Sequence, residues 1–494
     1  MNPPEILALI SASPSREWSR FIRVLFWVAV AFDVVVTVWM AWGEDLEWVP
    51  YLLGGLALLL LVSLRWPLNG FIALMLATAI PHYPLQLNGW NARADHFAAA
   101  AIIAIWVLGA PFRNAQRPLR WITVDYLLAA YVLSNYLSSV LMSPERLLSL
   151  RWAVLTSLVV LPYFFIRVLA VRYGYVGRVF RYFLTVGVLA AAYGIFCFLL
   201  HRIFGTTLGV ELDKYAPGIP GYYGSLYDSN NFGIYSASCS IMFLALYLFG
   251  KESYRRRCGF AFLITAIAMV ISLARAAMLG FTISAVFLGY LAVRRGILSR
   301  RAVFRLAALG SAGLLIASFA VGSQVGSRFS LIAGDNLAAD SSVRGRVVED
   351  LVAAEDISVH PILGNGTGSF HILFRAEDFK GIYASLEGAD YSLTDVENLP
   401  LRVLHDTGVI GFALFSAVFV FLALRIRKLI KQPSGEALPM LFALTAATLL
   451  DLVAFQFSDE SLLAFFWIHV GLLVSFVILL EAENAVDVLR PARI

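Results

Sequence analysis

Charged residues are scarce in this chain of 494 residues, at 14% of the sequence, whereas soluble globular domains carry roughly a quarter. Cysteine is also scarce, since the chain has 3 cysteines and no CxxC pair. We therefore predict neither a disulfide scaffold nor a cysteine-based metal site. The first residues lack the basic start and small-residue cleavage site of a signal peptide. We expect the first apolar segment to serve as its own insertion signal.

Hydrophobic residues, in contrast, account for 60% of the chain, and the mean hydropathy is +0.77. They form repeated apolar blocks, and a helix of roughly 20 apolar residues crosses a bilayer core. The pattern predicts an all-α, polytopic membrane bundle with about fourteen transmembrane helices. The expected spans are 22–42, 49–65, 68–81, 96–112, 121–142, 152–171, 182–203, 231–250, 258–273, 276–293, 303–322, 408–424, 437–456 and 461–481.

Lys and Arg collect in alternate loops, for example after the expected spans 96–112 and 152–171. Short cytoplasmic loops retain these residues, so we expect both termini in the cytoplasm. The net charge of +5 is then explained by the Lys and Arg residues of the cytoplasmic loops, and it does not indicate a nucleic-acid partner. The predicted regions are the first spans at 1–203, an outer loop with further spans at 204–322, a large periplasmic loop at 323–407 and the last spans at 408–494.

The large outer loop carries more acidic than basic side chains but is too apolar for a disordered tail. An apolar stripe at helical spacing is formed by Val347, Val348, Leu351 and Val352. It follows Ser341 and Ser342, which can cap a helix, and it ends before Pro361. We therefore expect a helical subdomain on the outer face. The Gly-, Pro- and Tyr-rich segment 204–230 indicates a second, smaller structured loop.

Polar groups near the outer surface are the candidates for chemistry, because a charge in the hydrocarbon core is expensive unless it is paired or lines a cavity. Arg275 follows an apolar span with almost no loop. It either snorkels to lipid phosphate or binds a lipid-linked pyrophosphate. The glycine-rich run 360–370 lacks the following Lys-Ser/Thr of a P-loop and is interpreted as a tight turn. Polar residues then recur at helical spacing from Asp395 to Asp406, just before a span.

Several of these features together resemble the O-antigen ligase and O-antigen polymerase superfamily. The matching elements are Ser272 to Arg275, Gly345-Arg346, the run 360–370, Glu397-Asn398, Asp406 to Gly411, and the Asp-x-Asn segment around Asn230. The resemblance covers roughly residues 220–415.

This resemblance implies a GT-C-like glycosyltransferase at the periplasmic side of the bacterial inner membrane. Such an enzyme transfers an oligosaccharide from an undecaprenyl-pyrophosphate carrier to an acceptor hydroxyl, with no cofactor or metal. It requires a base for the acceptor and cationic donors for the departing diphosphate. Many ligases have His at the position of Glu397, which favours a polymerase of O-antigen, capsule or exopolysaccharide. A ligase that uses lipid A core as acceptor is the alternative.

The resemblance assigns catalytic roles to Glu397 as the base and to Arg275 and Arg346 as leaving-group donors. Further candidates for binding the substrate are Arg344, Arg402, His371, His405, Asn398, Asn230 and Arg151. Among these, His371 and His405 are alternative bases. The expected partners are the lipid-linked oligosaccharide, an acceptor glycan and membrane lipid, with a chain-length-regulating co-polymerase as a further candidate.

A flippase or other transporter of lipid-linked oligosaccharides is a different class that fits many spans. The polar sites within the membrane would then be Asp33, Asp125, Asp451 and His469. The absence of a convincing inverted repeat argues against a transporter, and so does the large outer loop with its family-like motif. A glycosyltransferase with polyprenyl-phosphate donors is a third alternative, which the short first outer loop makes less favourable.

Overall fold

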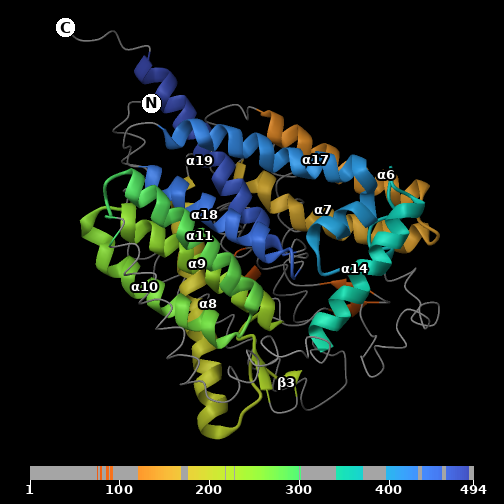
Figure 1. Ribbon diagram of the computed structural model, residues 1–494, viewed down its shortest axis with the longest axis horizontal. Coiled ribbons are helices and arrows are strands. Elements are labelled where there is room, and N and C mark those ends of the chain that lie inside the picture. Colours follow the sequence, from red (N-terminus) through yellow and green to blue (C-terminus); the bar gives the residue numbers. More distant parts are fainter. Residues whose placement is uncertain are drawn as a thin grey trace, which may run out of the picture.

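The computed structural model describes residues 75, 78, 79, 85–87, 90–92, 121–167, 176–216, 219–226, 228–299, 301, 341–370, 396–431, 437–458 and 463–488. Most of this part of the chain is helical (Figure 1). The helices are α6 (Thr123–Leu141), α7 (Arg146–Arg167), α8 (Val176–Phe204), α9 (Ser229–Phe249), α10 (Glu252–Ile271), α11 (Arg275–Arg294), α14 (Ser341–Val359), α17 (Leu399–Ile430), α18 (Leu438–Ala454) and α19 (Ala464–Val488).

Two short antiparallel hairpins accompany the helices. The first pairs β1 (Leu85–Leu87) with β2 (Trp90–Ala92), and the second pairs β3 (Val210–Ala216) with β4 (Ile219–Tyr222). The second hairpin follows the end of α8, and Tyr222 packs its ring against Phe198 of that helix. The prediction of a structured loop at 204–230 is therefore confirmed, and the hairpins are small exceptions to the all-α expectation.

Helices long and apolar enough to cross a membrane number 7 among the described residues, namely α6, α7, α8, α9, α11, α17 and the first part of α19. Every predicted span that falls on described sequence from residue 121 onward lies on a helix, including those at α10 and α18. A multi-pass helical membrane protein is thus confirmed. The predicted spans 22–42, 49–65, 96–112 and 303–322, and nearly all of 68–81, lie outside the described residues. The total of about fourteen spans and the positions of the termini stay predictions.

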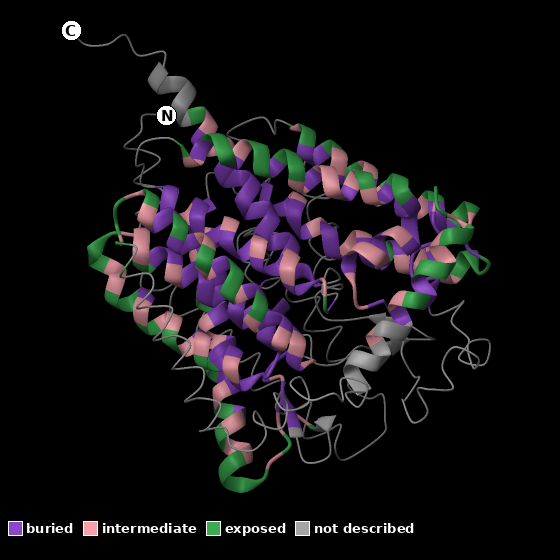
Figure 2. Ribbon diagram, viewed as in Figure 1, coloured by how far each residue is buried: buried purple, intermediate pink, exposed green. Residues whose placement is uncertain are grey.

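The core of the bundle surrounds α9 and α19, whose candidate spans are 78% and 83% buried inside the protein. Figure 2 shows this buried centre, with exposed residues on the outer helices. Small residues explain the dense packing of α9, because helices in lipid associate where Gly, Ala and Ser let their backbones approach closely. Its inner face includes Gly233, Ala237 and Ser240. A Cβ on Gly233 would lie 2.4 Å from Cβ of Ala274.

Three of the polar residues considered for a transporter are paired in the structure, namely Asp125, Asp451 and His469, whereas Asp33 lies outside the described residues. Asp125, in the first turn of α6, receives hydrogen bonds from Arg167 Nη2 at 2.8 Å and from the Tyr163 hydroxyl at 2.6 Å. Arg167 is the last residue of α7, so the pair joins the ends of two neighbouring helices. Burial of such a pair is tolerated because each charge keeps its partner.

A second buried group lies deeper in the bundle. The Asp451 carboxylate accepts a hydrogen bond from the Ser238 hydroxyl at 2.5 Å and lies 2.8 Å from Nδ1 of His469. All these side chains are fully buried. Ser238 and His469 each contact the Asp451 carboxylate. In a catalytic triad the histidine instead accepts the proton of the serine hydroxyl. His469 is therefore not placed to activate Ser238 as a nucleophile. This cluster joins α9, α18 and α19.

Candidate active site

An ion pair joins α14 to the residue just before α17. Nε of Arg346 lies 2.6 Å from Oε2 of Glu397, and Nη2 lies 2.5 Å from the same oxygen. The side chains are 25% and 39% exposed, so solvent and a ligand can reach them. Two residues that the sequence analysis placed in catalytic roles, separated by 51 positions in the chain, are therefore in direct contact.

Glu397 is held in place by the residues that start α17. Asn398 caps the helix, since its side chain accepts a hydrogen bond from the amide of Leu401 at 3.2 Å. Its Nδ2 group donates to the carbonyl of Gln456, and the amide of Leu399 donates to the carbonyl of Phe455. These bonds fasten the start of α17 to the end of α18. Asn398, predicted to bind substrate, acts in the structure as a helix cap beside the carboxylate.

The glycine-rich run 360–370 forms a tight turn, as interpreted from the sequence. Each amide from residue 364 to residue 369 donates a hydrogen bond within the protein. The acceptors are the carbonyls of His360, His405, Asp406 and Gly366, the hydroxyl of Ser139 and the carboxylate of Asp406. A phosphate-binding loop needs amides that point at the ligand. The six amides of residues 364–369 are occupied, so this part of the turn supports the site without presenting a phosphate cradle.

Glycine is required where α17 meets the turn, because the two backbones are in direct contact there. Gly408 breaks α17 with φ 62°, and a Cβ there would lie 2.3 Å from the carbonyl oxygen of Ile362. After the break, the amides of Val409 and Ile410 donate to the carbonyls of Pro361 and Ile362. The kink thus gives the helix backbone new partners and locks the turn to α17.

The same turn also contacts the first helices of the described bundle. Gly368 has φ +68°, and a Cβ there would lie 2.3 Å from Cγ of Trp152 in α7. The Thr367 hydroxyl donates to Oδ1 of Asn135 in α6 at 2.9 Å, and the Ser149 hydroxyl donates to the Thr367 carbonyl at 2.8 Å. The turn therefore joins α6, α7, α14 and α17 beneath the Arg346–Glu397 pair.

His405, one of the predicted alternative bases, is enclosed by two carboxylates. Its Nδ1 lies 3.1 Å from Oδ1 of Asp406, and its Nε2 lies 3.1 Å from Oδ2 of Asp356 on α14. The imidazole is 0% exposed. A general base must reach the proton that it removes, and neither ring nitrogen is open to a substrate. His405 is placed to dock α14 on α17 through Asp356, a contact that no motif in the sequence indicates.

Arg275 begins α11 after a tight connection from α10. Leu273 in this connection has φ 58°, a left-handed conformation that is strained for a leucine. Ser272 stabilises the turn by accepting a hydrogen bond from the amide of Ala274 at 3.3 Å. Gly280 packs against the carbonyl of Leu450, which sets the start of α11 beside the end of α18. The end of α18 also holds the start of α17, so Arg275 and Glu397 lie at the same end of the bundle.

The remaining predicted residues have different positions. Arg402 is buried, and its Nε lies 4.0 Å from Oδ2 of Asp406, so it belongs to the support of the loop. Asn230 lies in the first turn of α9, where its amide donates to the Asp228 cap at 2.6 Å. Arg151 lies on α7 next to Trp152, close to the glycine turn, and is half-buried.

Two predicted candidates cannot be placed as side chains. Arg344 is on α14, but its side chain lies outside the described residues, and His371 lies wholly outside them. The helix of the large loop is confirmed as α14, although its apolar face differs from the prediction. Leu351 is 52% exposed, whereas Val352 and Ala353 pack with Phe370 and Val396.

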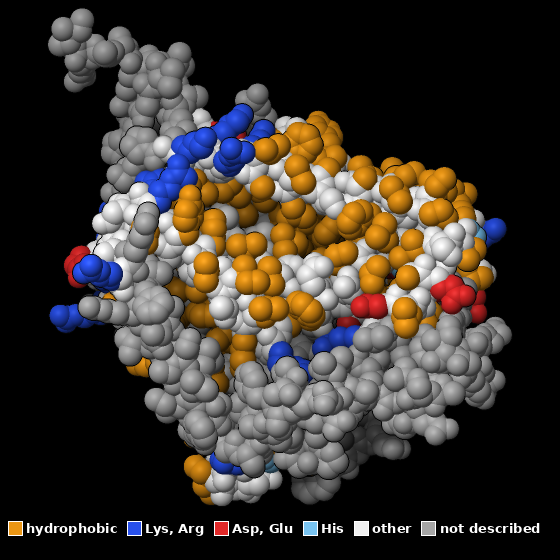
Figure 3. Space-filling view, in the orientation of Figure 1, with side chains coloured by type: hydrophobic (Ala, Val, Ile, Leu, Met, Phe, Trp, Pro, Cys, Tyr) orange, Lys and Arg blue, Asp and Glu red, His pale blue; other side chains and the backbone are white. Residues whose placement is uncertain are grey.

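The arrangement combines a reachable cation with a reachable carboxylate at one end of a membrane bundle. Figure 3 shows acidic and basic side chains along the lower edge of the described surface, and a separate group of basic side chains at its upper left. No cluster of three or more His, Cys, Asp or Glu side chains suited to a metal occurs within the described residues. The described groups fit proton abstraction by a carboxylate and stabilisation of an anionic leaving group by guanidinium.

Comparison with known proteins gives one family. The model for O-antigen ligase matches residues 260–416, a segment that contains Arg275, Arg346, Glu397 and the glycine turn. The resemblance recognised in the sequence is confirmed there, while Asn230 and Arg151 lie outside the matched segment. No curated protein matches the chain. The match supports a membrane enzyme of the O-antigen ligase and polymerase type, which acts on a lipid-linked glycan and an acceptor.

Proposed function

We propose, on the premise that residues 260–416 form an O-antigen ligase segment, that the protein is a glycan polymerase at the outer face of the inner membrane. It transfers oligosaccharide repeat units from an undecaprenyl-diphosphate donor to a sugar hydroxyl of the acceptor. The Arg346–Glu397 pair carries this proposal, because it places a reachable carboxylate and a reachable guanidinium in contact within that segment.

The proposed reaction is a substitution at the anomeric carbon of the donor. The acceptor hydroxyl oxygen forms the new bond to this carbon while the bond from the carbon to the phosphate oxygen breaks. The diphosphate leaves with the electron pair, and the hydroxyl proton passes to the Glu397 carboxylate. Arg346 and Arg275 stabilise the negative charge that develops on the leaving diphosphate, since a guanidinium matches phosphate oxygens with two parallel hydrogen bonds.

The ion pair also suggests how the donor prepares the base. In the structure Oε2 of Glu397 accepts a hydrogen bond from Nε of Arg346, so the guanidinium occupies this oxygen. A diphosphate competes for the same guanidinium and carries more negative charge. When Arg346 turns to the diphosphate, the Glu397 carboxylate becomes available to the acceptor hydroxyl. Base activation is thereby coupled to the presence of donor.

The outer-face location is supported by charge at the opposite end of the same helices. α11 begins at Arg275 and ends at Arg294, while α17 begins beside Glu397 and has Arg427 and Lys428 in its last turn. The positive-inside rule places Lys- and Arg-rich helix ends in the cytoplasm. The ends that carry Arg275 and Glu397 are then on the periplasmic side.

The choice of polymerase over ligase depends on Glu397. A carboxylate stands where many ligases of the resembled superfamily have histidine, and the nearby His405 is enclosed by carboxylates. The ligase alternative differs only in its acceptor. Purified protein given lipid-linked repeat units alone should lengthen them if it is a polymerase, whereas a ligase should form product only after lipid A core is added.

The decisive experiment uses purified protein and lipid-linked repeat units in detergent micelles, where no membrane gradient exists. We expect glycans of more than one repeat on a gel. Glu397→Gln should lower the rate by about 10²–10⁴-fold, and Arg275→Ala should also abolish transfer. Glu355→Gln is the matched control, because Glu355 is an exposed carboxylate on α14.

A flippase would give no product from any variant in this assay, with or without lipid A core. Full activity of Glu397→Gln would remove the assigned base, and normal product from Arg275→Ala would remove that arginine from the leaving-group site.

A further inference from the structure

A groove of about 710 Å³ opens on the side of the bundle between α11 and α17. This volume lies within the range of roughly 300–1,000 Å³ that is usual for small-molecule sites. The walls are almost entirely apolar and include Phe287 and Tyr290 of α11, Phe419 and Ala423 of α17, and Leu449 and Leu452 of α18. Figure 3 shows an apolar hollow on this face.

The packing of the helices explains why a groove forms here. α11 packs along α18, whereas α17 packs mainly on α6 and also contacts α19. α18 is therefore left as the floor between these two helices. At one end the groove is closed, because Nη2 of Arg295 donates to the carbonyl of Ile430 at 2.7 Å and its guanidinium lies over the ring of Phe442.

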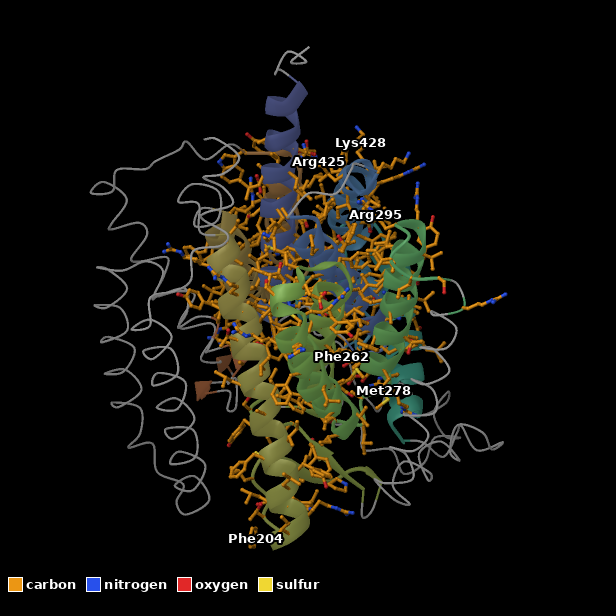
Figure 4. The ribbon with its side chains drawn as sticks, turned by 90° about the vertical axis from the view of Figure 1, so that its left-hand side faces the viewer. Phe204, Phe262, Met278, Arg295, Arg425 and Lys428 are labelled. Atoms are coloured by element: carbon orange, nitrogen blue, oxygen red, sulfur yellow. The ribbon has the colours of Figure 1, made fainter. Side chains whose placement is uncertain are left out.

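Three cations border the groove at this closed end. Arg294 of α11, Arg427 of α17 and the following Lys431 all line it, and all are exposed. Figure 4 shows the neighbouring Arg295, Arg425 and Lys428 toward the same end, with Met278 of α11 toward the other. Apolar walls below a cationic rim are complementary to an amphiphile that has an anionic head and a hydrocarbon tail.

The length of the groove fits one leaflet of a bilayer. Its lining runs along α17 from Phe419 to Lys431, the residue that follows the helix. This stretch corresponds to about 18 Å at 1.5 Å per residue. Half of a hydrocarbon core is about 15 Å. A tail that lies along the groove, with its head at the cationic rim, therefore reaches about the middle of the membrane.

We propose that this groove binds an anionic phospholipid of the cytoplasmic leaflet. An acyl chain lies between α11 and α17, and the phosphate lies among Arg294, Arg427 and Lys431. The diphosphate carrier of the glycan is a poorer match, because its head belongs at the opposite ends of these helices, beside Arg275 and Glu397. The inference does not depend on the proposed glycan transfer.

The test is native mass spectrometry of the purified full-length protein titrated with phosphatidylglycerol or, separately, phosphatidylcholine. The triple variant Arg294→Gln/Arg427→Gln/Lys431→Gln should bind phosphatidylglycerol at least about tenfold more weakly, since each Lys or Arg near an anionic lipid surface contributes roughly fivefold. Arg256→Gln/Arg257→Gln/Lys428→Gln is the control. It removes the same charge from exposed positions that do not line the groove, and its affinity should stay unchanged.

A second pair of variants tests the apolar walls. Ala423→Trp fills the groove and should reduce retention of phosphatidylglycerol, whereas Leu424→Trp, on the exposed lipid side of α17 and outside the groove lining, should not. Equal affinity for the two phospholipids, or equal losses in both triple variants, would overturn the proposal. Loss of undecaprenyl phosphate in Ala423→Trp with phosphatidylglycerol retained would identify the glycan carrier as the occupant instead.

Discussion

Arg346 of α14 donates a hydrogen bond to Glu397 across a distance of 2.6 Å, in a position where both side chains remain partly exposed. An exposed ion pair contributes about 0.2–1 kcal/mol to stability. The contact is therefore too weak to be the main attachment of α14, for which the His405 and Asn365 contacts with α17 are better placed.

We predict that a double-mutant cycle of Arg346→Gln and Glu397→Gln will give a coupling energy in thermal unfolding below about 1 kcal/mol. Each single variant should nevertheless lose glycan transfer. The measurements are unfolding in detergent and product formation from lipid-linked repeat units. A coupling energy of several kcal/mol, with glycan transfer retained in the single variants, would show that the pair stabilises the fold and has no role in catalysis.

The glycine turn provides a prediction with an internal control. Gly368→Ala should lower the free energy of unfolding by about 2–5 kcal/mol, because it adds a left-handed alanine and a clash with Trp152. Gly296 has nearly the same φ but open space around it. Gly296→Ala should therefore lose only about 1–2 kcal/mol. Similar losses in the two variants, measured by thermal unfolding, would contradict the close packing of the turn on α7.

His405 should prove structural. His405→Gln removes an imidazole from between Asp356 and Asp406, and we expect at least about 1–3 kcal/mol of lost stability. Its remaining transfer activity should keep the pH dependence of the parent protein. If the acidic limb of the rate profile disappears in His405→Gln but persists in Glu397→Gln, the base has been assigned to the wrong residue.

Asp350 on α14 gives a pH-dependent prediction. Burial raises the pKa of this carboxyl, and the Arg346 guanidinium lowers it by less. The folded chain then keeps the proton to a higher pH than the unfolded chain does, so this group lowers stability as pH rises from about 4 through the folded pKa. Asp350→Asn should raise the melting temperature at neutral pH, and the gain should vanish near pH 4. The exposed Glu355→Gln serves as control, and a gain that is the same at all pH values would exclude titration of Asp350.

The sequence predicted the helices well, because apolar blocks and caps are local signals. α14 begins and ends near the positions that Ser341 and Pro361 indicated, whereas α17 begins before the predicted span 408–424 and continues beyond it to Ile430. The buried face of α14 was partly wrong. Leu351 fits the helical spacing of apolar residues but lies outside the cluster that contains Val352 and Phe370, and it is exposed. The spacing shows which residues share a face of α14, but it does not show which part of that face the glycine turn will cover.

The candidate site was only partly predictable for the same reason. Family-like motifs identified Arg346 and Glu397, but their contact depends on the turn that brings α14 back to α17. His405 was interpreted as a candidate base because a histidine near an outer surface is suited to that role. Its burial depends on Asp356, which sits 49 residues earlier and has no sequence signal apart from its place on the α14 helix, near the buried Val352 and Ala353.

The small cluster of Val352, Ala353, Phe370 and Val396 has a consequence for the alignment of the ion pair. Val352 and Ala353 belong to the helix that carries Arg346, whereas Val396 directly precedes Glu397. The apolar contacts of this cluster therefore set the separation of two charged side chains that lie outside it. A cavity made there by Val396→Ala would loosen the pair without changing either charge.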